Sequence, residues 1–454
     1  MKSAAIVGAG ITGLTAGCTL KDAGVAVRAF ESGGRVGGVL RSWREQGFLA
    51  ESGPNSLQVV SPDTLHFLNK RGLDTLESAP MARKRFVVWK GRLEPLPLSL
   101  WQFLRTPLLS VRGKLRLLGE PFIRRTASEP REESIAAFTR RRLGDEVVDA
   151  VLNPFIAGIY AGDAEALSVR YALPRLYALE QRHGSLFKGA WRQRRTALLR
   201  GASFKPRTVS FQGGMEALPR KLGEQLGDAV SLNVCIEAIR RCNAQWQIHW
   251  RFASEETLRT SVFDALILTL PAYRLAALPF EPALAKRLQL FNEIEYPPLS
   301  VLVLGVQREQ VAHPLDGFGF LVPEKEQLSV LGALFSSTLF PNRAPSGYVT
   351  LTVFVGGVRQ PECARLPTKA LRERVMDDLQ HLIGLKPPLR YCRHMFWPRA
   401  IPQYTLGYNR FLDRFDALEG EHAGLYFAGH YRDGVALGQC IEAGLRCAQN
   451  VLAF

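Results

Sequence analysis

Long hydrophobic runs are missing from this sequence of 454 residues, which contains no uncharged apolar stretch of about eighteen residues or more. A helix that crosses a membrane needs about 20 such residues, so we expect no membrane-spanning segment. The amino terminus also lacks the succession of basic region, apolar core and cleavage site that marks a secretory signal. No export is therefore expected.

Paired cysteines are missing as well. The seven cysteines are Cys18, Cys235, Cys242, Cys363, Cys392, Cys440 and Cys447. They form an odd set without a CxxC pair and without a histidine at metal-ligand spacing, which argues against a disulfide scaffold and against a zinc site. We expect reduced, buried thiols, a cytoplasmic protein and no bound metal. No arrangement typical of a Ser-His-Asp triad or of paired catalytic carboxylates is present either.

Apolar content and positive charge are both high. Hydrophobic residues make up 46% of the chain, enough to bury the cores of two or three interleaved domains, because 454 residues exceed one ordinary core. The net charge of +16 and the pI near 9.8 favour an anionic partner: nucleic acid, an acidic membrane face or a carboxylate-rich substrate. No recognised nucleic-acid module accompanies the charge, so nucleic acid is not an expected partner.

A dinucleotide-binding fingerprint opens the chain. Apolar residues 4–7 predict a strand, residues 14–23 predict a helix, and between them stand Gly8, Ala9, Gly10, Ile11, Thr12 and Gly13. The first glycine allows a tight turn, the second lets backbone amides approach a pyrophosphate, and the third lets the helix pack against the strand. The next predicted strand is followed by Glu31, where a carboxylate accepts hydrogen bonds from a ribose. The pattern predicts a nucleotide site and argues against NADP.

A second glycine-rich loop favours FAD over NAD. Residues 34–38 are Gly-Arg-Val-Gly-Gly, an extension that FAD enzymes often carry after the acidic residue. Arg35 and Arg41 are candidates for contact with a phosphate or with the pyrimidine edge of the flavin. The strand-like run 424–430 and the helix after it form another candidate contact. The amide end of that helix, placed beside the flavin, would stabilise negative charge on the reduced ring.

The segment from 83 to 142 interleaves leucines and aromatic residues with lysine and arginine. Two interpretations stay open. A basic amphipathic surface carrying Trp101 and Phe122 suits the interface of an anionic membrane, which predicts a peripheral contact with the cytoplasmic membrane face. Alternatively, the leucines form the core of a helical insert.

Many short runs resemble one family, in the same order along nearly the whole chain. The longest is Asn153-Pro154-Phe155-Ile156-Ala157-Gly158-Ile159-Tyr160-Ala161-Gly162-Asp163, and the others lie at 167–168, 174–176, 183–186, 317–323, 331–337, 354–357 and 402–404. On these motifs the sequence resembles the oxygen-dependent protoporphyrinogen oxidases, flavoproteins of haem synthesis.

The resemblance implies an amine-oxidase-like architecture, in the class α/β with α+β. It consists of a Rossmann-like FAD-binding domain built from separated segments, a substrate domain with a mixed sheet and a helical membrane-associated insert. The corresponding segments here are 1–82, 207–275 and 390–454 for the FAD-binding domain, 83–206 for the insert and 276–389 for the substrate domain.

The resemblance also implies where non-covalent FAD is held. The expected contacts are Gly8, Ala9, Gly10, Ile11, Thr12, Gly13, Glu31, Ser32, Arg35, Gly38, Val39, Gly53, Pro54, Asn55, Ser56, Ile236, Trp397, Gly429, His430, Val435, Ala436 and Leu437. Ile236 stands where the family usually has valine and still offers an apolar contact to adenine. His430 departs from the family's typical residue, which leaves its role open.

A substrate slot is implied at Arg85, Gly158, Leu321, Leu334 and Phe354. Leucines and an aromatic ring can enclose a flat macrocycle, the Gly158 carbonyl can accept from pyrrole N–H groups, and the Arg85 guanidinium can pair with a propionate. Without the resemblance, the three apolar residues fit ordinary core packing, and another basic residue of the cluster 83–85 could serve instead of Arg85.

The implied reaction is the six-electron oxidation of protoporphyrinogen IX to protoporphyrin IX through FAD, with dioxygen as acceptor and hydrogen peroxide as product. No catalytic side chain is assigned. Coproporphyrinogen III, with four propionates instead of two, stays an alternative substrate. Another amine-oxidase-like flavoenzyme and a non-catalytic protein that binds a flavin or a tetrapyrrole are further alternatives. A homodimer is a possible assembly.

Overall fold

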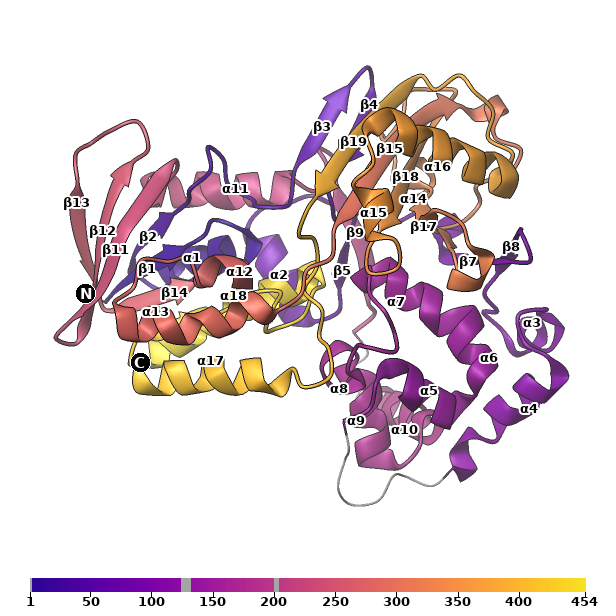
Figure 1. Cartoon of the computed structure of the whole chain (residues 1–454), viewed down its shortest axis with the longest axis horizontal. Coiled ribbons are helices and arrows are strands. Elements are labelled where there is room, and N and C mark those ends of the chain that lie inside the picture. The colour runs from indigo at the N-terminus through magenta and orange to yellow at the C-terminus, as the bar shows by residue number, and fades with distance from the viewer. Residues whose placement is uncertain (1, 124–131, 200–203) are drawn as a thin grey trace.

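The computed structural model describes residues 2–123, 132–199 and 204–454. Figure 1 shows three parts: a parallel sheet with its helices on the left, a second sheet at the upper right and a group of helices at the lower right. Indigo, pink and yellow ribbons all enter the left-hand part. Segments from the beginning, the middle and the end of the chain therefore build it together.

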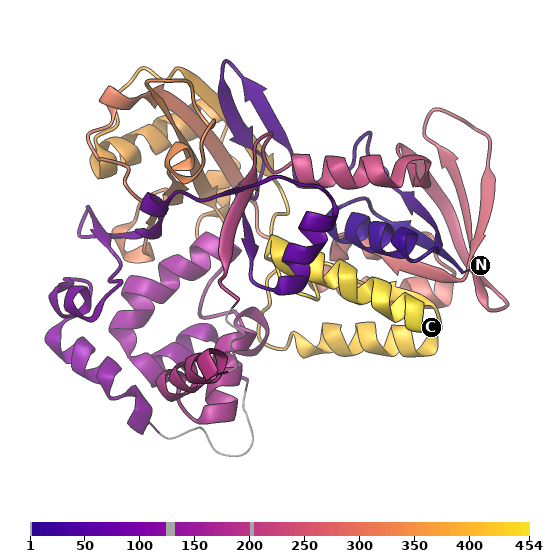
Figure 2. The same ribbon diagram turned by 180° about the vertical axis from the view of Figure 1, so that it is seen from behind.

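The left-hand part is organised around a parallel five-stranded sheet. In spatial order its strands are β10 (Val230–Ser231), β2 (Ala26–Phe30), β1 (Ser3–Val7), β14 (Ala265–Leu268) and β20 (Leu425–Phe427). Helices α1 (Ile11–Asp22) and α18 (Leu437–Ala453) lie side by side, as Figures 1 and 2 both show. A Cβ on Gly444 of α18 would come within 2.6 Å of the Thr12 carbonyl oxygen. The first and last helices of the chain thus form one close-packed layer.

A small antiparallel sheet borders this part, with the strands β11 (Val234–Cys242), β12 (Gln245–Phe252) and β13 (Arg259–Phe263). Trp250 packs edge-on against Phe30 of β2, with ring centroids 5.4 Å apart. Asp264 accepts a hydrogen bond from the Ser3 amide at 2.8 Å and separates β13 from β14. Two strands adjacent in sequence therefore belong to different sheets.

The second sheet has seven strands. In spatial order they are β19 (Tyr391–Trp397), β15 (Leu299–Gln307), β18 (Tyr348–Gly356), β17 (Val330–Leu334), β16 (Gly319–Leu321), β7 (Phe86–Trp89) and β8 (Arg92–Pro95). Because β7 and β16 are parallel and their neighbours antiparallel, the sheet is mixed, as expected. Helix α16 (Thr368–Ile383) covers one face, where Leu371 and Val375 pack with Phe320 and Val353. Alternate strand residues point to the other face.

Two segments that the sequence analysis assigns to other domains both contribute strands to this sheet. The segment 83–206, expected as a helical insert, begins with the hairpin β7–β8, and β7 pairs with β16. The segment 390–454, expected in the FAD-binding domain, begins with β19, which pairs with β15. The physical reason is that a strand joins a sheet through partners distant in sequence, which local composition does not reveal. The helical part therefore begins only after β8.

The helical part contains α3 (Leu100–Arg105), α4 (Val111–Leu118), α5 (Ile135–Leu143), α7 (Asn153–Tyr160), α9 (Pro174–His183) and α10 (Leu186–Leu199). Buried charges connect these helices. Arg142 and Glu120 are both fully buried, with Nη1 and Oε1 3.5 Å apart, and Arg142 Nε lies 2.9 Å from Glu180 Oε1. Glu120 also accepts from the Ser185 hydroxyl and from the Leu186 amide at the start of α10. No described helix has the length and apolarity to cross a membrane.

Candidate cofactor and substrate site

The turn between β1 and α1 has the geometry of a nucleotide cradle. Gly8 adopts φ of +105°, and a Cβ on Gly8 would lie 3.0 Å from the Thr269 hydroxyl. A Cβ on Gly13 would overlap the Gly8 carbonyl oxygen. In contrast, a Cβ on Gly10 would meet nothing within 4 Å. The outer glycines are therefore required by packing, whereas the space beside Gly10 is open to a ligand.

Helix α1 presents uncapped amides to this space. Its N-cap residue Gly10 offers no side-chain hydrogen bond, and the first turn, which includes Ile11 and Thr12, contains no acidic residue. The first amides of a helix have no partner within the helix and carry the positive end of its dipole, so this end suits a phosphate. The residues present thus fit the pyrophosphate of FAD, which Gly10, Ile11 and Thr12 would hold.

Glu31 follows the end of β2, beside the glycine turn, as the sequence predicts. Its Oε2 atom accepts from the Ala9 amide at 2.9 Å, and its Oε1 atom accepts from the Gly33 amide at 2.8 Å. Ser32, next in sequence, is exposed. The carboxylate occupies the place from which a ribose-binding acid acts.

Ile236 lies near this acid, in β11. It pairs with Trp250, at an irregularity of register between Ile236 and Ala238. Two residues earlier, the amide of Val234 donates to the Glu31 carbonyl oxygen at 2.9 Å. The half-buried Ile236 is therefore on the adenine side of the expected site.

Arg35 is not free in this structure. Its guanidinium donates to the carbonyl oxygens of Val36, Gly38 and Leu40 at 2.6 to 3.0 Å. The exposed Val39 belongs to the same loop, and its carbonyl accepts from the Ser52 hydroxyl at 2.5 Å. Arg35 therefore shapes the second glycine-rich loop from within.

The turn Gly53-Pro54-Asn55-Ser56 joins the two large parts of the molecule. It follows β4 (Phe48–Glu51), and Trp397 at the end of β19 donates from Nε1 to the Ser52 carbonyl oxygen at 2.8 Å. The amide oxygen of buried Asn55 accepts from the Thr352 hydroxyl of β18 at 3.2 Å. Two strands of the seven-stranded sheet thereby hold an expected flavin-binding turn.

Glu51, at the end of β4, reinforces this junction. It accepts from the Ser42 hydroxyl at 2.6 Å and from the Met215 amide at 2.9 Å, and it lies 4.0 Å from buried Arg343. Burial raises the pKa of Glu51 to about 7, against the opposing effects of Ser42 and Arg343.

The chain after β20 is fixed by a tyrosine. The Tyr404 hydroxyl donates to the His430 carbonyl oxygen at 2.5 Å and accepts from the Gly434 amide at 2.9 Å. Gly429 has φ of +148°, and its amide donates to Asp433 at 2.9 Å. This backbone leads through Val435, Ala436 and Leu437 into α18, whose N-cap residue Ala436 has no polar side chain. The Ala436 amide donates to the Gln439 side chain at 3.0 Å, whereas Ala436 offers no side-chain acceptor to the amides that follow, so the start of α18 is capped in part.

The imidazole of His430 stands edge-on to Tyr296, with ring centroids 5.7 Å apart. Among the residues that the structure describes, neither ring nitrogen has a hydrogen-bond partner, and the side chain is half-buried. Burial lowers the pKa of His430 to about 4, because the surrounding protein disfavours the imidazolium. His430 is therefore neutral at neutral pH and retains free hydrogen-bonding capacity.

The expected substrate residues outside α7 share one face of the seven-stranded sheet. Leu321 pairs with Gly332, which in turn pairs with Phe354, and directly paired residues point to the same side. Leu334 lies two positions after Gly332 in β17 and so points to the same side. Leu321 also pairs with Val87 of β7, and Arg85 lies two positions before Val87. Period-two alternation therefore places all four on the face opposite α16.

Helix α7 meets this face at Gly158. A Cβ on Gly158 would overlap the Cδ2 atom of Leu321, so glycine permits the contact. The guanidinium of Arg359 donates to the Val322 carbonyl oxygen at 2.9 Å and to the Asn153 carbonyl oxygen at 2.8 Å. Arg359 thereby fastens the start of α7 to the end of β16.

Arg85 has no acidic partner among the described residues. Its guanidinium carbon lies 4.7 Å from the ring centroid of Phe318, whereas the neighbouring Lys84 pairs with Asp316. The protein around Arg85 lowers its pKa by displacing water, although the side chain remains accessible. Since a guanidinium stays charged at any physiological pH, Arg85 is a cation available to a carboxylate.

Sequence analysis missed several residues that build the site: Thr269, Phe318, Arg359 and Tyr404. The Thr269 hydroxyl donates to the carbonyl oxygens of Val7 and Gly8 at 3.1 and 2.9 Å. The sequence indicates this role only by the position of Thr269 directly after a buried parallel strand. The other three act through contacts with residues far away in sequence, for which no local pattern exists.

Comparisons with known proteins agree with this geometry. A family model described as flavin containing amine oxidoreductase matches residues 11–452. Protoporphyrinogen oxidase 2 of Arabidopsis thaliana, described as chloroplastic/mitochondrial, is 34% identical over 484 residues, covering 100% of this chain and 94% of the relative. Protoporphyrinogen oxidase of Homo sapiens is 32% identical over 488 residues, covering 99% of this chain and 98% of the relative.

Solved structures share the fold. A crystal structure from Exiguobacterium sp. 255-15, described provisionally as a protoporphyrinogen oxidase, superposes with a TM-score of 0.81 at 23% identity and covers 100% of this chain and 99% of its own. A putrescine oxidase reaches a TM-score of 0.67 at 18% identity, with 100% and 99% coverage. The expected fold class, the resemblance and the FAD cofactor are confirmed. The chain belongs to the flavin-containing amine oxidoreductase family and is an FAD-dependent oxidoreductase.

Proposed function

We propose that this protein oxidises protoporphyrinogen IX to protoporphyrin IX. The observation that carries the proposal is Arg85, a cation to which the described residues offer no acidic partner, on the sheet face that also bears Leu321, Leu334 and Phe354. A flat apolar wall with a guanidinium at its edge suits a flat macrocycle that carries a propionate. The names of the relatives that match the whole chain support the same substrate class.

FAD, which Gly10, Ile11 and Thr12 would hold, would supply the redox chemistry: the oxidation would proceed by two electrons in each of three cycles, with dioxygen reduced to hydrogen peroxide. The residues of the chain bind and orient the substrate. Arg85 pairs with a propionate through two parallel N–H groups, while the apolar wall excludes water. The Gly158 carbonyl lies in the last turn of α7, where carbonyls lack helical partners, and accepts from a pyrrole N–H.

The activity is tested by supplying protoporphyrinogen and coproporphyrinogen side by side to the purified flavoprotein and following porphyrin fluorescence and hydrogen peroxide. We expect faster turnover of protoporphyrinogen, and at least about tenfold weaker binding of the dicarboxylate in R85M. Coproporphyrinogen, which the net charge of +16 favours, is the substrate if its turnover is the faster. If neither porphyrinogen is turned over by protein with bound FAD, the proposal fails.

We further propose that the helical part contacts an anionic membrane. Its exposed apolar side chains are Leu98, Leu100, Trp101, Leu104, Val111, Leu115, Leu118, Phe122, Phe187 and Trp191, each between 43% and 86% exposed. Leu98 lies just before α3, and the others belong to α3, α4, α10 and the turn before residue 123. Lys114 of α4 connects α4 to α3 by donating to the Leu104 carbonyl oxygen at 2.9 Å. Between residues 98 and 123, all of them described, Leu108 and Leu109 are the buried leucines and fit the alternative of an internal core.

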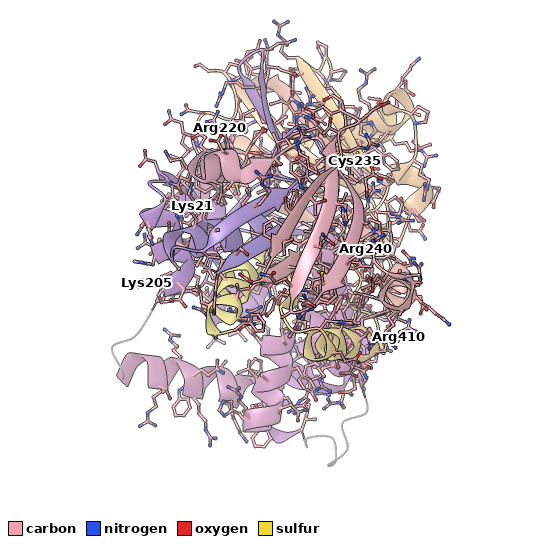
Figure 3. All side chains as sticks on the ribbon, turned by 90° about the vertical axis from the view of Figure 1, so that its left-hand side faces the viewer. Lys21, Lys205, Arg220, Cys235, Arg240 and Arg410 are labelled. Atoms are coloured by element: carbon pink, nitrogen blue, oxygen red, sulfur yellow. The ribbon has the colours of Figure 1, made fainter. Side chains whose placement is uncertain are left out.

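Basic side chains accompany the apolar ones. Arg105 lies over Trp101 at 4.3 Å and Arg195 lies over Trp191 at 5.5 Å, measured to the ring centroids. Figure 3 shows α10 extending beyond the other helices. Aromatic side chains beside guanidinium groups suit an interface where rings enter the headgroup layer and cations meet phosphates.

Vesicles of phosphatidylglycerol and phosphatidylcholine test this contact. We expect R192E/R194E, which changes two exposed residues of α10, to weaken flotation with anionic vesicles by about tenfold or more, since each basic residue near such a surface contributes about 1 kcal/mol. The matched control R220E/R240E makes the same change in net charge on a distant face, where Figure 3 labels Arg220 and Arg240. Equal flotation of both double variants would disprove the contact.

A further inference from the structure

The side chain of Arg85 is ordered by a contact other than an ion pair. The described residues provide no carboxylate for its guanidinium, and Asp316 pairs with the neighbouring Lys84. An unpaired arginine on a flexible stem loses rotamer entropy when a ligand immobilises it. A substrate anchor therefore benefits from a partner that orders it beforehand.

The ring of Phe318 is that partner in the structure. The Arg85 guanidinium carbon lies 4.7 Å from the ring centroid, within the range of a cation–π contact. The ring is itself fixed, because the Phe318 amide donates to the Lys84 carbonyl oxygen at 2.7 Å, directly before Arg85. Gly317 makes this approach possible, since a Cβ there would lie 2.9 Å from the same oxygen.

A stacked ring orders the guanidinium without occupying it. A cation–π contact needs no acidic acceptor, so the N–H donors of the guanidinium stay available to a carboxylate, which can bind two of them in bidentate fashion. An acidic partner would compete with the substrate for those donors. Phe318 also packs with Leu334 around Ala82, Leu339 and Phe340, so the ring adjoins the apolar wall as well.

We propose that Phe318 is a positioning residue that orders Arg85 for a carboxylate of the substrate and so favours substrates that carry one. This inference rests on the proposed function for the identity of the macrocycle. Phe318 acts through Arg85, so its contribution is confined to ligands whose carboxylates are free.

Binding of protoporphyrin IX and of its dimethyl ester, followed by fluorescence on the FAD-loaded protein, separates this role from simple packing. We expect F318L, which keeps an apolar side chain but removes the ring, to weaken binding of the diacid by about three- to tenfold and to leave ester binding unchanged. F318Y, which retains the ring, should bind the diacid as the wild type does. The thermal midpoint of each variant shows that it is folded.

A double-mutant cycle completes the test. We expect R85M/F318L to bind the diacid no more weakly than R85M, because the ring has no function without the cation. Equal losses for the diacid and the ester in F318L, or additive losses in the cycle, would overturn the proposal. So would an R85M variant that binds the diacid as tightly as the wild type.

Turnover is measured separately and reports on the proposed function alone. If the wild type binds the diacid in preference to the ester, and F318L lowers only diacid binding, Phe318 has the role assigned here. The same protein failing to oxidise either porphyrinogen would then contradict the proposed oxidation without affecting the inference.

Discussion

The indole nitrogen of Trp397 donates a hydrogen bond to the carbonyl oxygen of Ser52 at 2.8 Å, and so connects the last strand of the seven-stranded sheet to the turn expected to contact the flavin. Trp397 is itself an expected flavin contact. The sheet that bears the expected substrate residues is thereby held against the expected cofactor turn.

W397F should weaken FAD binding by about three- to tenfold, because the ring remains while one hydrogen bond to a buried carbonyl is lost. Flavin release on dilution, followed by fluorescence, measures the affinity. W246F is the matched control, since the Trp246 indole nitrogen has no hydrogen-bond partner among the described residues. Equal FAD affinities of W397F and the wild type would contradict the prediction.

The substitutions G10A and G13A should impair the protein in different ways. A Cβ on Gly10 meets no protein atom within 4 Å, so G10A should fold normally but bind FAD about 10- to 100-fold more weakly, because the new methyl group enters the space for the pyrophosphate. A Cβ on Gly13 overlaps a backbone oxygen, so G13A should be destabilised even without FAD.

Urea unfolding of the FAD-free variants and flavin titration distinguish these two effects. A G10A protein that binds FAD like the wild type would show that the pyrophosphate does not approach Gly10.

G158A should impair the substrate slot more than the fold. The added Cβ displaces the flexible end of Leu321, which turns into the space of the macrocycle, so we expect porphyrinogen turnover to fall by about tenfold while FAD content is retained. G420A in α17 (Asn409–Glu421) is the control, because a Cβ there meets nothing within 4 Å and alanine stabilises a helix. Turnover of G158A at the wild-type rate would refute the placement of the slot.

Stability should depend on His430 at acidic pH. Its folded-state pKa of about 4 lies below the ordinary value of 6.5, so the unfolded chain binds the proton at higher pH than the folded protein does. The stability contributed by the neutral ring is present above about pH 6.5 and is lost as the pH falls towards 4.

Urea unfolding at pH 7 and pH 5 should therefore show a larger loss of stability for the wild type than for H430N, whose amide does not titrate. Identical losses in the two proteins would mean that His430 keeps an ordinary pKa when folded.

E120Q should destabilise the helical part by about 3 to 5 kcal/mol, because it leaves the buried charge of Arg142 without its full complement of acidic neighbours. Urea unfolding and the rate of limited proteolysis measure the effect. E165Q removes the exposed partner of Arg140 and should change the stability by no more than about 1 kcal/mol. Similar values for the two variants would argue against the buried network.

Local patterns were sufficient to predict the cofactor cradle. The glycines, Glu31 and the carboxyl-terminal turn each carry a signal within a few residues, and the structure places them after β1, β2 and β20, three strands of one parallel sheet. The hairpin β7–β8 was assigned to the helical insert because its pairing with β16 joins residues far apart in sequence. Phe318 and Arg359 were missed for the same reason, since each acts on a group that only the fold brings near.

The buried ion network of the insert also has no sequence signature. Glu120, Arg142 and Glu180 belong to a segment that is rich in basic residues, for which the sequence predicts a charged surface. In the structure, Glu120 and Arg142 are fully buried. Only the packing of α5 against α9 and the start of α10 removes them from water.

The layer formed by α1 and α18 has a consequence for biosynthesis. Strand β1 receives its partner β14 only after residue 265 has been translated, and α18, which packs against α1, is translated only from residue 437 onwards. We therefore expect a chain that is cut before α18 to retain FAD poorly, although its glycine fingerprint is complete.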